Sequence, residues 1–169
     1  GWVGHLAGFS AMDIHMGCPV PQVYKNVEGS ELLGDLPRAE KIISACKKSG
    51  KTVSVKFRIG LDKNSIVAAE FARMCEGAGA DMITVHGRTR DMYYAGEPDY
   101  AAIASAKNAV KLPVVANGGI FCRDRALQML RATVPDRLTG VGPGRRVAHH
   151  VSRSVRPPGP RASRSAAHA

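Results

Sequence analysis

The sequence lacks the features of several common protein classes. No apolar run approaches the roughly 20 residues that a membrane-spanning helix needs, and no charged segment followed by an apolar one opens the chain, so we expect neither a membrane partner nor a secretory signal. The four cysteines, at positions 18, 46, 75 and 122, form no CxxC pair. Zinc sites usually need that spacing, so we expect no metal. Scattered thiols suit a reducing compartment, and we expect a cytoplasmic protein.

Positive charge is distributed unevenly along the chain. The 169 residues carry a net charge of +10, and the stretch from Arg137 to the end holds seven arginines but neither lysine nor acid. Residues 133–169 also contain five of the ten prolines. We therefore predict a folded domain over residues 1–132 and a basic tail rich in Pro, Arg and Ala over residues 133–169. The tail is expected to be either out-of-frame translation of GC-rich DNA or a disordered basic arm that contacts nucleic acid.

Strands and helices alternate in the predicted domain. The segments rich in β-branched and apolar residues, which predict strands, are 9–16, 52–59, 81–86 and 113–116. The segments with apolar residues three and four positions apart, which predict helices, are 38–48, 66–76, 98–110 and 123–131. Residues 20–36 are expected to form a loop, and Asn64 or Ser65 is the expected N-cap of the second helix. This alternation favours parallel β/α units.

Polar residues recur near the ends of the predicted strands at a nearly constant period. Cys18, Lys56, His86 and Asn117 are separated by 38, 30 and 31 residues. A (β/α)8 barrel of about 250 residues allots about 31 residues to each unit. A doubly wound sheet is the alternative, but the GxGxxG motif that often follows its first strand is absent. The sequence therefore predicts an α/β fold, a partial TIM-type barrel of about four β/α units, and we expect the chain to be a fragment of a longer protein.

The residues at the strand ends predict one site at the mouth of the barrel. Cys18 lies between a glycine and a proline that end the first strand, so its thiol stands at the start of a loop. Lys56 alternates with apolar neighbours and therefore points to the opposite face of its strand, where it needs an anionic or polar partner. His86 has the same position one unit later. The turn Asn117-Gly118-Gly119 offers unhindered backbone N–H groups, which suit a phosphate group.

Together these residues favour flavin mononucleotide (FMN) as the cofactor. A phosphate-binding turn suits the phosphate group of FMN, and cationic side chains stabilise the negative charge of a reduced flavin. A thiol beside the flavin can donate or accept a proton.

Four motifs resemble those of a known family. Residues 12–30 (MDIHMGCPVPQVYKNVEGS) are similar to the signature of the tRNA-dihydrouridine synthases. The segments VKFRIG (55–60), TVHGRTR (84–90) and ANGGI (116–120) follow in the family's order and at its spacing. The resemblance covers roughly residues 8–132. It implies an FMN-binding barrel followed by a helical tRNA-binding domain, and an enzyme that reduces uridine to 5,6-dihydrouridine in tRNA with NADPH as the reductant.

The resemblance also implies roles for individual residues. Cys18 would protonate C5 of the uracil while hydride reaches C6 from the opposite face, and the base would have to leave the tRNA stack. Arg58 and Arg88 match candidate contacts to the flavin or the nucleotide. His15 stands where the family usually has an asparagine that touches the target uracil, so a variant substrate contact is expected there. The residues that match flavin or phosphate contacts are Lys56, His86, Asn117, Gly118 and Gly119.

Two other functions are compatible with these residues. A flavin barrel that oxidises a small molecule, of the dihydroorotate dehydrogenase type, also has a Cys or Ser at the barrel mouth, but uses it as a base. Alternatively, the chain is a truncated product without function. The pairing of Gly17-Cys18-Pro19 with Gly29-Ser30 favours the tRNA enzyme. We expect the parent protein to be a monomer and this fragment to be inactive alone.

Overall fold

The computed structural model describes residues 9–139 and 151–152, and it contains one six-stranded sheet. The elements in chain order are β1 (Ala11–Met16), α1 (Pro21–Tyr24), the 3-10 helix η2 (Gly29–Gly34), α2 (Leu36–Lys47), β2 (Thr52–Arg58), α3 (Ala68–Gly77), β3 (Met82–His86), α4 (Tyr100–Asn108), β4 (Val114–Asn117), α5 (Arg123–Thr133), β5 (Arg137–Thr139) and β6 (Val151–Ser152). Among the described helices, none is long and apolar enough to cross a membrane.

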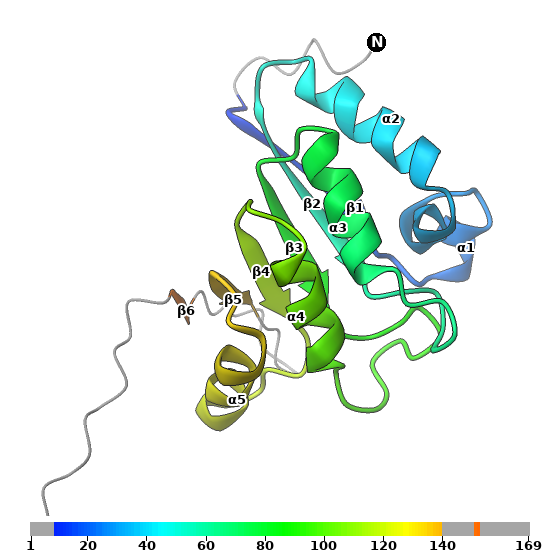
Figure 1. Ribbon diagram of the computed structural model, residues 1–169. Helices are drawn as coiled ribbons and strands as arrows, with labels where there is room; N and C mark the ends of the chain where they lie inside the picture. Colours follow the sequence, from blue (N-terminus) through cyan, green and yellow to red (C-terminus); the bar gives the residue numbers. More distant parts are fainter. Residues whose placement is uncertain (1–8, 140–150, 153–169) are drawn as a thin grey trace, which may run out of the picture.

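The order of the strands identifies the type of sheet. Strands β1 to β5 are parallel and lie side by side in chain order, and β6 pairs with β5 in the antiparallel sense. Helices α2, α3 and α4 line one face of this sheet (Figure 1). A doubly wound sheet reverses its strand order at a switch point, whereas a (β/α)8 barrel keeps it. The chain therefore forms part of a TIM-type barrel, and the predicted fold class is confirmed.

The hydrophobic core lies between the sheet and the helices. Val53, Val55 and Phe57 of β2 are fully buried, and the ring of Phe57 lies 4.7 Å from the ring of Phe71 on α3. Lys56 alternates with these residues and is only partly buried, so it lies on the opposite face, as its position in the strand predicted. In a closed barrel this second face lines the interior, and here it carries the polar side chains of the strands.

Two predicted boundaries differ from the structure. The predicted loop over residues 20–36 contains the short helix α1 and the 3-10 helix η2. The second predicted helix begins at Ala68, and its N-cap is Val67 rather than Asn64 or Ser65. The helix starts late because Ile66 is engaged in a β-bridge with Gly60, two residues after β2 ends.

The sheet continues beyond residue 132, where we expected the tail to begin. Leu138 of β5 is 1% exposed, and β5 pairs with β4 in parallel. Just before β5, Asp136 accepts a hydrogen bond from the amide of Val114 at 2.8 Å and pairs with Lys107 at 2.7 Å. The barrel segment therefore extends to Thr139, and a boundary at residue 132 is too early.

The same arrangement occurs two β/α units earlier, which supports this extension. Asp81, just before β3, accepts a hydrogen bond from the amide of Val53 at 2.7 Å and pairs with Lys47 at the end of α2. In both places a carboxylate joins the last turn of a helix to the first amides of a strand. The other tail predictions concern residues 140–150 and 153–169, which lie outside the described residues.

Candidate active site

The carboxyl ends of the strands bring the predicted site residues to one edge of the sheet. His15 of β1 lies opposite Lys56 of β2, Arg58 lies opposite His86 of β3, and His86 lies opposite Asn117 of β4. Residues paired in this way share a face of the sheet. The register therefore gathers these five side chains on the face that the helices leave uncovered.

Cys18 occupies a tightly folded turn after β1. A Cβ on Gly17 would lie 3.3 Å from the backbone of Phe57, so glycine allows the turn to approach the end of β2. The carbonyl of Cys18 accepts a hydrogen bond from the amide of Ser30 at 3.1 Å. Gly29 has a φ of +57°, and a Cβ there would lie 2.9 Å from the carbonyl oxygen of Cys18. These contacts hold the half-buried thiol in place.

The positive charges beside Cys18 have no carboxylate in salt-bridge contact. Over the described residues, neither Lys56, Arg58 nor Arg88 takes part in a salt bridge. Burial is the main cause that lowers the pKa of Lys56, and the charge of Arg58 lowers it further, while Asp13 and Cys18 act in the opposite direction. A cluster of positive charges that no carboxylate of the described residues neutralises in a salt bridge favours an anionic ligand at the mouth of a barrel.

His86 is a neutral hydrogen-bond donor in this site. Burial, followed by the charges of Arg58 and Lys56, lowers its pKa to about 3. Its Nδ1 accepts a hydrogen bond from the amide of Arg88 at 3.2 Å, so the proton of the neutral ring is on Nε2. A Cβ on Gly118 would lie 3.4 Å from that Nε2. The N–H of His86 is therefore next to the turn that follows β4.

The turn after β4 contains two glycines with positive φ. Gly118 and Gly119 have φ values of +115° and +68°, a region that favours glycine. Within the described residues, their amides donate to no acceptor. Asn117 donates from Nδ2 to the carbonyl of Thr139 at 2.8 Å and so ties β4 to β5. Two available amides beside the N–H of His86 fit an anionic group such as the phosphate of FMN.

Arg58 lies at the centre of the site, but its N–H donors are hydrogen-bonded to backbone carbonyls. It is 3% exposed, and its Nε donates to the carbonyl of Gly17 at 3.0 Å. Its Nη1 donates to the carbonyls of Thr89 and Tyr93 at 3.0 Å and 2.8 Å, and its guanidinium carbon lies 5.7 Å from the ring centre of Tyr94. A contact of Arg58 with flavin or nucleotide stays a prediction.

Arg88 also holds the loop between β3 and α4. It is 5% exposed, and its Nε and Nη2 donate to the carbonyl of Gly96 at 3.1 Å and 2.8 Å, with a further bond from Nε to Ala95. A salt bridge of 2.7 Å between Arg90 and Glu31 joins this loop to η2. The predicted cationic residues therefore also act as structural ties, which local sequence patterns did not show.

Two more features of the site concern β1. The pKa of His15 is lowered, first by partial burial and then by the charge of Lys56. Asp13 was not predicted as a site residue, yet it accepts a hydrogen bond from the hydroxyl of Ser54 and influences the pKa of both His15 and Lys56. Its position two residues before His15, on the same face of β1, is the signal in the sequence.

Sequence comparison places these residues in a family. The family model described as dihydrouridine synthase matches residues 4–141. The chain is 37% identical over 130 residues to a probable tRNA-dihydrouridine synthase from Rhizobium leguminosarum bv. phaseoli, 40% to one from Rickettsia conorii and 41% to one from Synechocystis sp., over the same length. These matches cover 76% of this chain and 41%, 39% and 37% of the relatives. The chain thus spans about two fifths of the length of the relatives that it matches.

Comparison with solved structures agrees on the architecture. A 2,3-dimethylmalate lyase, a member of the PEP mutase/isocitrate lyase superfamily, superposes with a TM-score of 0.54 at 16% identity, over 82% of this chain and 50% of that chain. At this identity the likeness concerns the fold alone. The family match extends over most of the chain and contains every residue of the site described above. The chain belongs to the dihydrouridine synthase family.

Proposed function

We propose that this chain forms the central part of the active site of a tRNA-dihydrouridine synthase, which reduces uridine to 5,6-dihydrouridine in tRNA. One observation carries the proposal: a thiol, a neutral histidine, a lysine without a salt bridge and two amides without an acceptor among the described residues meet at one edge of the sheet. The names of the relatives, which the chain matches at 37–41% identity, support the substrate. The proposed partners are tRNA, FMN and NADPH.

Each of the described residues would have a separate role in the site. FMN, when bound, would supply the hydride for C6 of the uracil and would itself be reduced by NADPH. The amides of Gly118 and Gly119 and the Nε2–H of His86 would hold its phosphate or another anionic group. Lys56 would stabilise negative charge on the reduced ring, and Cys18 would donate the proton that C5 receives.

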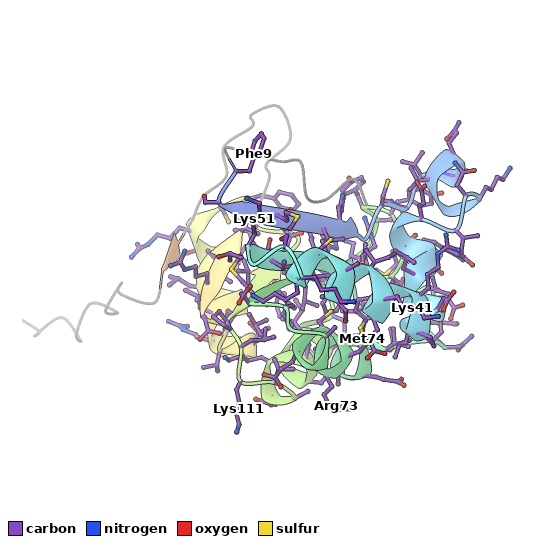
Figure 2. The ribbon with its side chains drawn as sticks, turned by 90° about the horizontal axis from the view of Figure 1, so that it is seen from above. Phe9, Lys41, Lys51, Arg73, Met74 and Lys111 are labelled. Carbon is purple, nitrogen blue, oxygen red and sulfur yellow. The ribbon has the colours of Figure 1, made fainter. Side chains whose placement is uncertain are left out.

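FMN binding by this chain tests the cofactor part of the proposal. We expect Lys56→Ala to weaken FMN affinity about 10- to 100-fold, because a charge-assisted hydrogen bond contributes about 1.5–3 kcal/mol. Lys41→Ala is the matched control, since Lys41 lies on the helical layer at α2 and is exposed (Figure 2). Quenching of flavin fluorescence measures both affinities. Equal affinities of the two variants would contradict the role of Lys56.

Turnover is tested in a chimera, because the chain spans about two fifths of its relatives. The matched 130 residues replace the aligned segment of the Rickettsia conorii relative. We expect the chimera to add two hydrogen atoms to uridine in a tRNA transcript, which mass spectrometry of the nucleosides detects. Cys18→Ala should keep the flavin and lose most of this turnover. Wild-type rates from that variant would contradict the role of Cys18 as the proton donor.

The chimera also discriminates the alternative function. A small-molecule flavin dehydrogenase would reduce its flavin with a substrate such as dihydroorotate and leave tRNA unmodified. Its cysteine would act as a base on that substrate, so Cys18→Ala would slow flavin reduction. In the tRNA enzyme NADPH reduces the flavin, and we expect Cys18→Ala to leave that half-reaction unchanged.

A further inference from the structure

We propose that Arg58 is a positioning residue that fixes Cys18 relative to the loop between β3 and α4, so that the thiol and this loop open and close as one unit. The inference rests on the proposed function for its consequence, the alignment of the thiol with a substrate. Its test uses neither flavin nor tRNA, so that failure of the inference is distinguishable from failure of the proposed function.

The guanidinium group of Arg58 joins two loops that are distant in sequence. Its Nε donates a hydrogen bond to the carbonyl of Gly17, which precedes Cys18 and lies 41 positions before Arg58. Its Nη1 bonds the carbonyls of Thr89 and Tyr93, which are 31 and 35 positions away. Arginine suits this place because its planar group presents several donors in fixed directions, whereas a lysine ammonium group acts as a single point.

The loop that Arg58 holds contains a residue in an unfavourable conformation. Tyr93 has a φ of 50°, which is uncommon for a residue other than glycine and costs of order 1–3 kcal/mol. Its carbonyl accepts the 2.8 Å bond from Arg58, and the next side chain, Tyr94, lies over the guanidinium group. The bond therefore compensates for the strain, and its loss should release both the turn and Tyr94.

A second tie, between the loop that follows β3 and η2, is more exposed and therefore weaker. The salt bridge between Arg90 and Glu31 has side chains that are 27% and 38% exposed, and such pairs contribute little to stability. Glu31 follows Ser30, whose amide bonds the carbonyl of Cys18. The buried Arg58 is therefore the stronger of the two ties.

The cysteines of the chain report on this coupling. Cys18 is half-buried, Cys75 in the core is fully buried, and Cys122 is exposed. Alkylation with iodoacetamide, followed by mass spectrometry of each cysteine peptide across a range of pH, gives two quantities for Cys18. The plateau rate at high pH reports opening of the turn, and the midpoint reports the charges around the thiol.

The decisive variant is Arg58→Lys, which keeps the positive charge and removes the planar guanidinium group with its several donors. We expect the plateau rate of Cys18 to rise about fivefold or more, because at least one charged hydrogen bond is lost, with an unchanged midpoint and unchanged rates for Cys75 and Cys122. Arg73→Lys on α3 is the matched control, since Arg73 is exposed (Figure 2), and it should behave as wild type. An unchanged plateau for Cys18, or an equal rise for Cys75, would overturn the proposal.

Hydrogen exchange of the wild-type chain tests the coupling even if the variant does not fold. The amides of Ser30 and Ala95 are bonded to the carbonyls of Cys18 and Met92, one in each loop. If the loops form one unit, the peptides that contain these amides should show the same opening free energy and respond alike to low denaturant. Opening equilibria that differ more than about tenfold between the two peptides would refute the coupling.

Discussion

The neutral state of His86 leads to a prediction about acid stability. In the folded chain its pKa is lowered from 6.5 to about 3, mainly by burial. As the pH falls below 6.5, the unfolded chain binds this proton first, so His86 contributes stability above pH 6.5 that is lost progressively toward pH 3. Replacing it with an asparagine, which does not titrate, should remove this component of the pH dependence.

The size of the effect follows from the two pKa values. Between pH 7 and pH 5, a shift from 6.5 to about 3 lowers the free energy of unfolding by about 2 kcal/mol. Wild type should therefore lose about 2 kcal/mol more than His86→Asn over this interval. A constant cost of the substitution cancels, because each protein is compared with itself. The carboxylates with lowered pKa values, such as Asp81, titrate below this window.

Urea unfolding at pH 7 and pH 5, followed by far-UV circular dichroism, measures this difference. Long-range proton–nitrogen NMR of the folded chain provides a direct check, because the bond from the Arg88 amide to Nδ1 requires the proton on Nε2. Equal losses of stability in wild type and His86→Asn, or a ring that protonates near pH 6.5 in the folded chain, would refute the assignment of His86 as a neutral donor.

Two further predictions concern the β4 side of the sheet. Asp136→Ala should lower the free energy of unfolding by about 1–3 kcal/mol, because the amide of Val114 loses its acceptor. Urea unfolding measures this loss, and Glu40→Ala on the exposed face of α2 is the control that should show none. Equal stabilities of the two variants would contradict a stabilising role for Asp136. Gly118→Ala should lower the melting temperature and weaken FMN binding, because its φ is +115° and a Cβ would lie 3.3 Å from the ring of His86. Gly50→Ala is its control, since Gly50 also has a positive φ, +73°, but faces open space. This variant should lose stability and keep its FMN affinity. Equal FMN affinities of the two variants would argue against phosphate binding at the turn after β4.

Strands β1 to β4 and the meeting of the predicted residues at one edge of the sheet were predictable from the sequence, because both depend on local order. Alternation on β2 places Lys56 opposite its buried neighbours, and a constant period places the end of every strand at the same edge. The register of the strands adds information that this period does not contain, namely which residues of neighbouring strands lie opposite each other. It pairs Arg58 with His86 and His86 with Asn117, so that these side chains share one face.

The remaining features depend on contacts between distant residues. The carbonyl partners of Arg58 lie 31 to 41 positions away, so a pattern around VKFRIG does not distinguish a ligand contact from a structural tie. The start of α3 at Ala68 follows from a bridge between Gly60 and Ile66, which outweighs the capping preference of Ser65. Strand β5 was missed because three residues carry no period, although Asp136 repeats the position that Asp81 occupies before β3.

The two sides of the site use their hydrogen-bond donors differently, and this difference bears on affinity and alignment. Arg58 and Arg88 are already bonded to carbonyls of their own chain, so these donors gain little when a ligand arrives. In the part of the chain that the structure describes, the amides of Gly118 and Gly119 and the Nε2–H of His86 donate to no protein acceptor. Bonds formed only on binding add directly to affinity, whereas bonds present beforehand reduce the cost of ordering. Affinity for an anionic ligand should therefore come from Lys56 and from the β4 side, and the alignment of the thiol from Arg58 and Arg88.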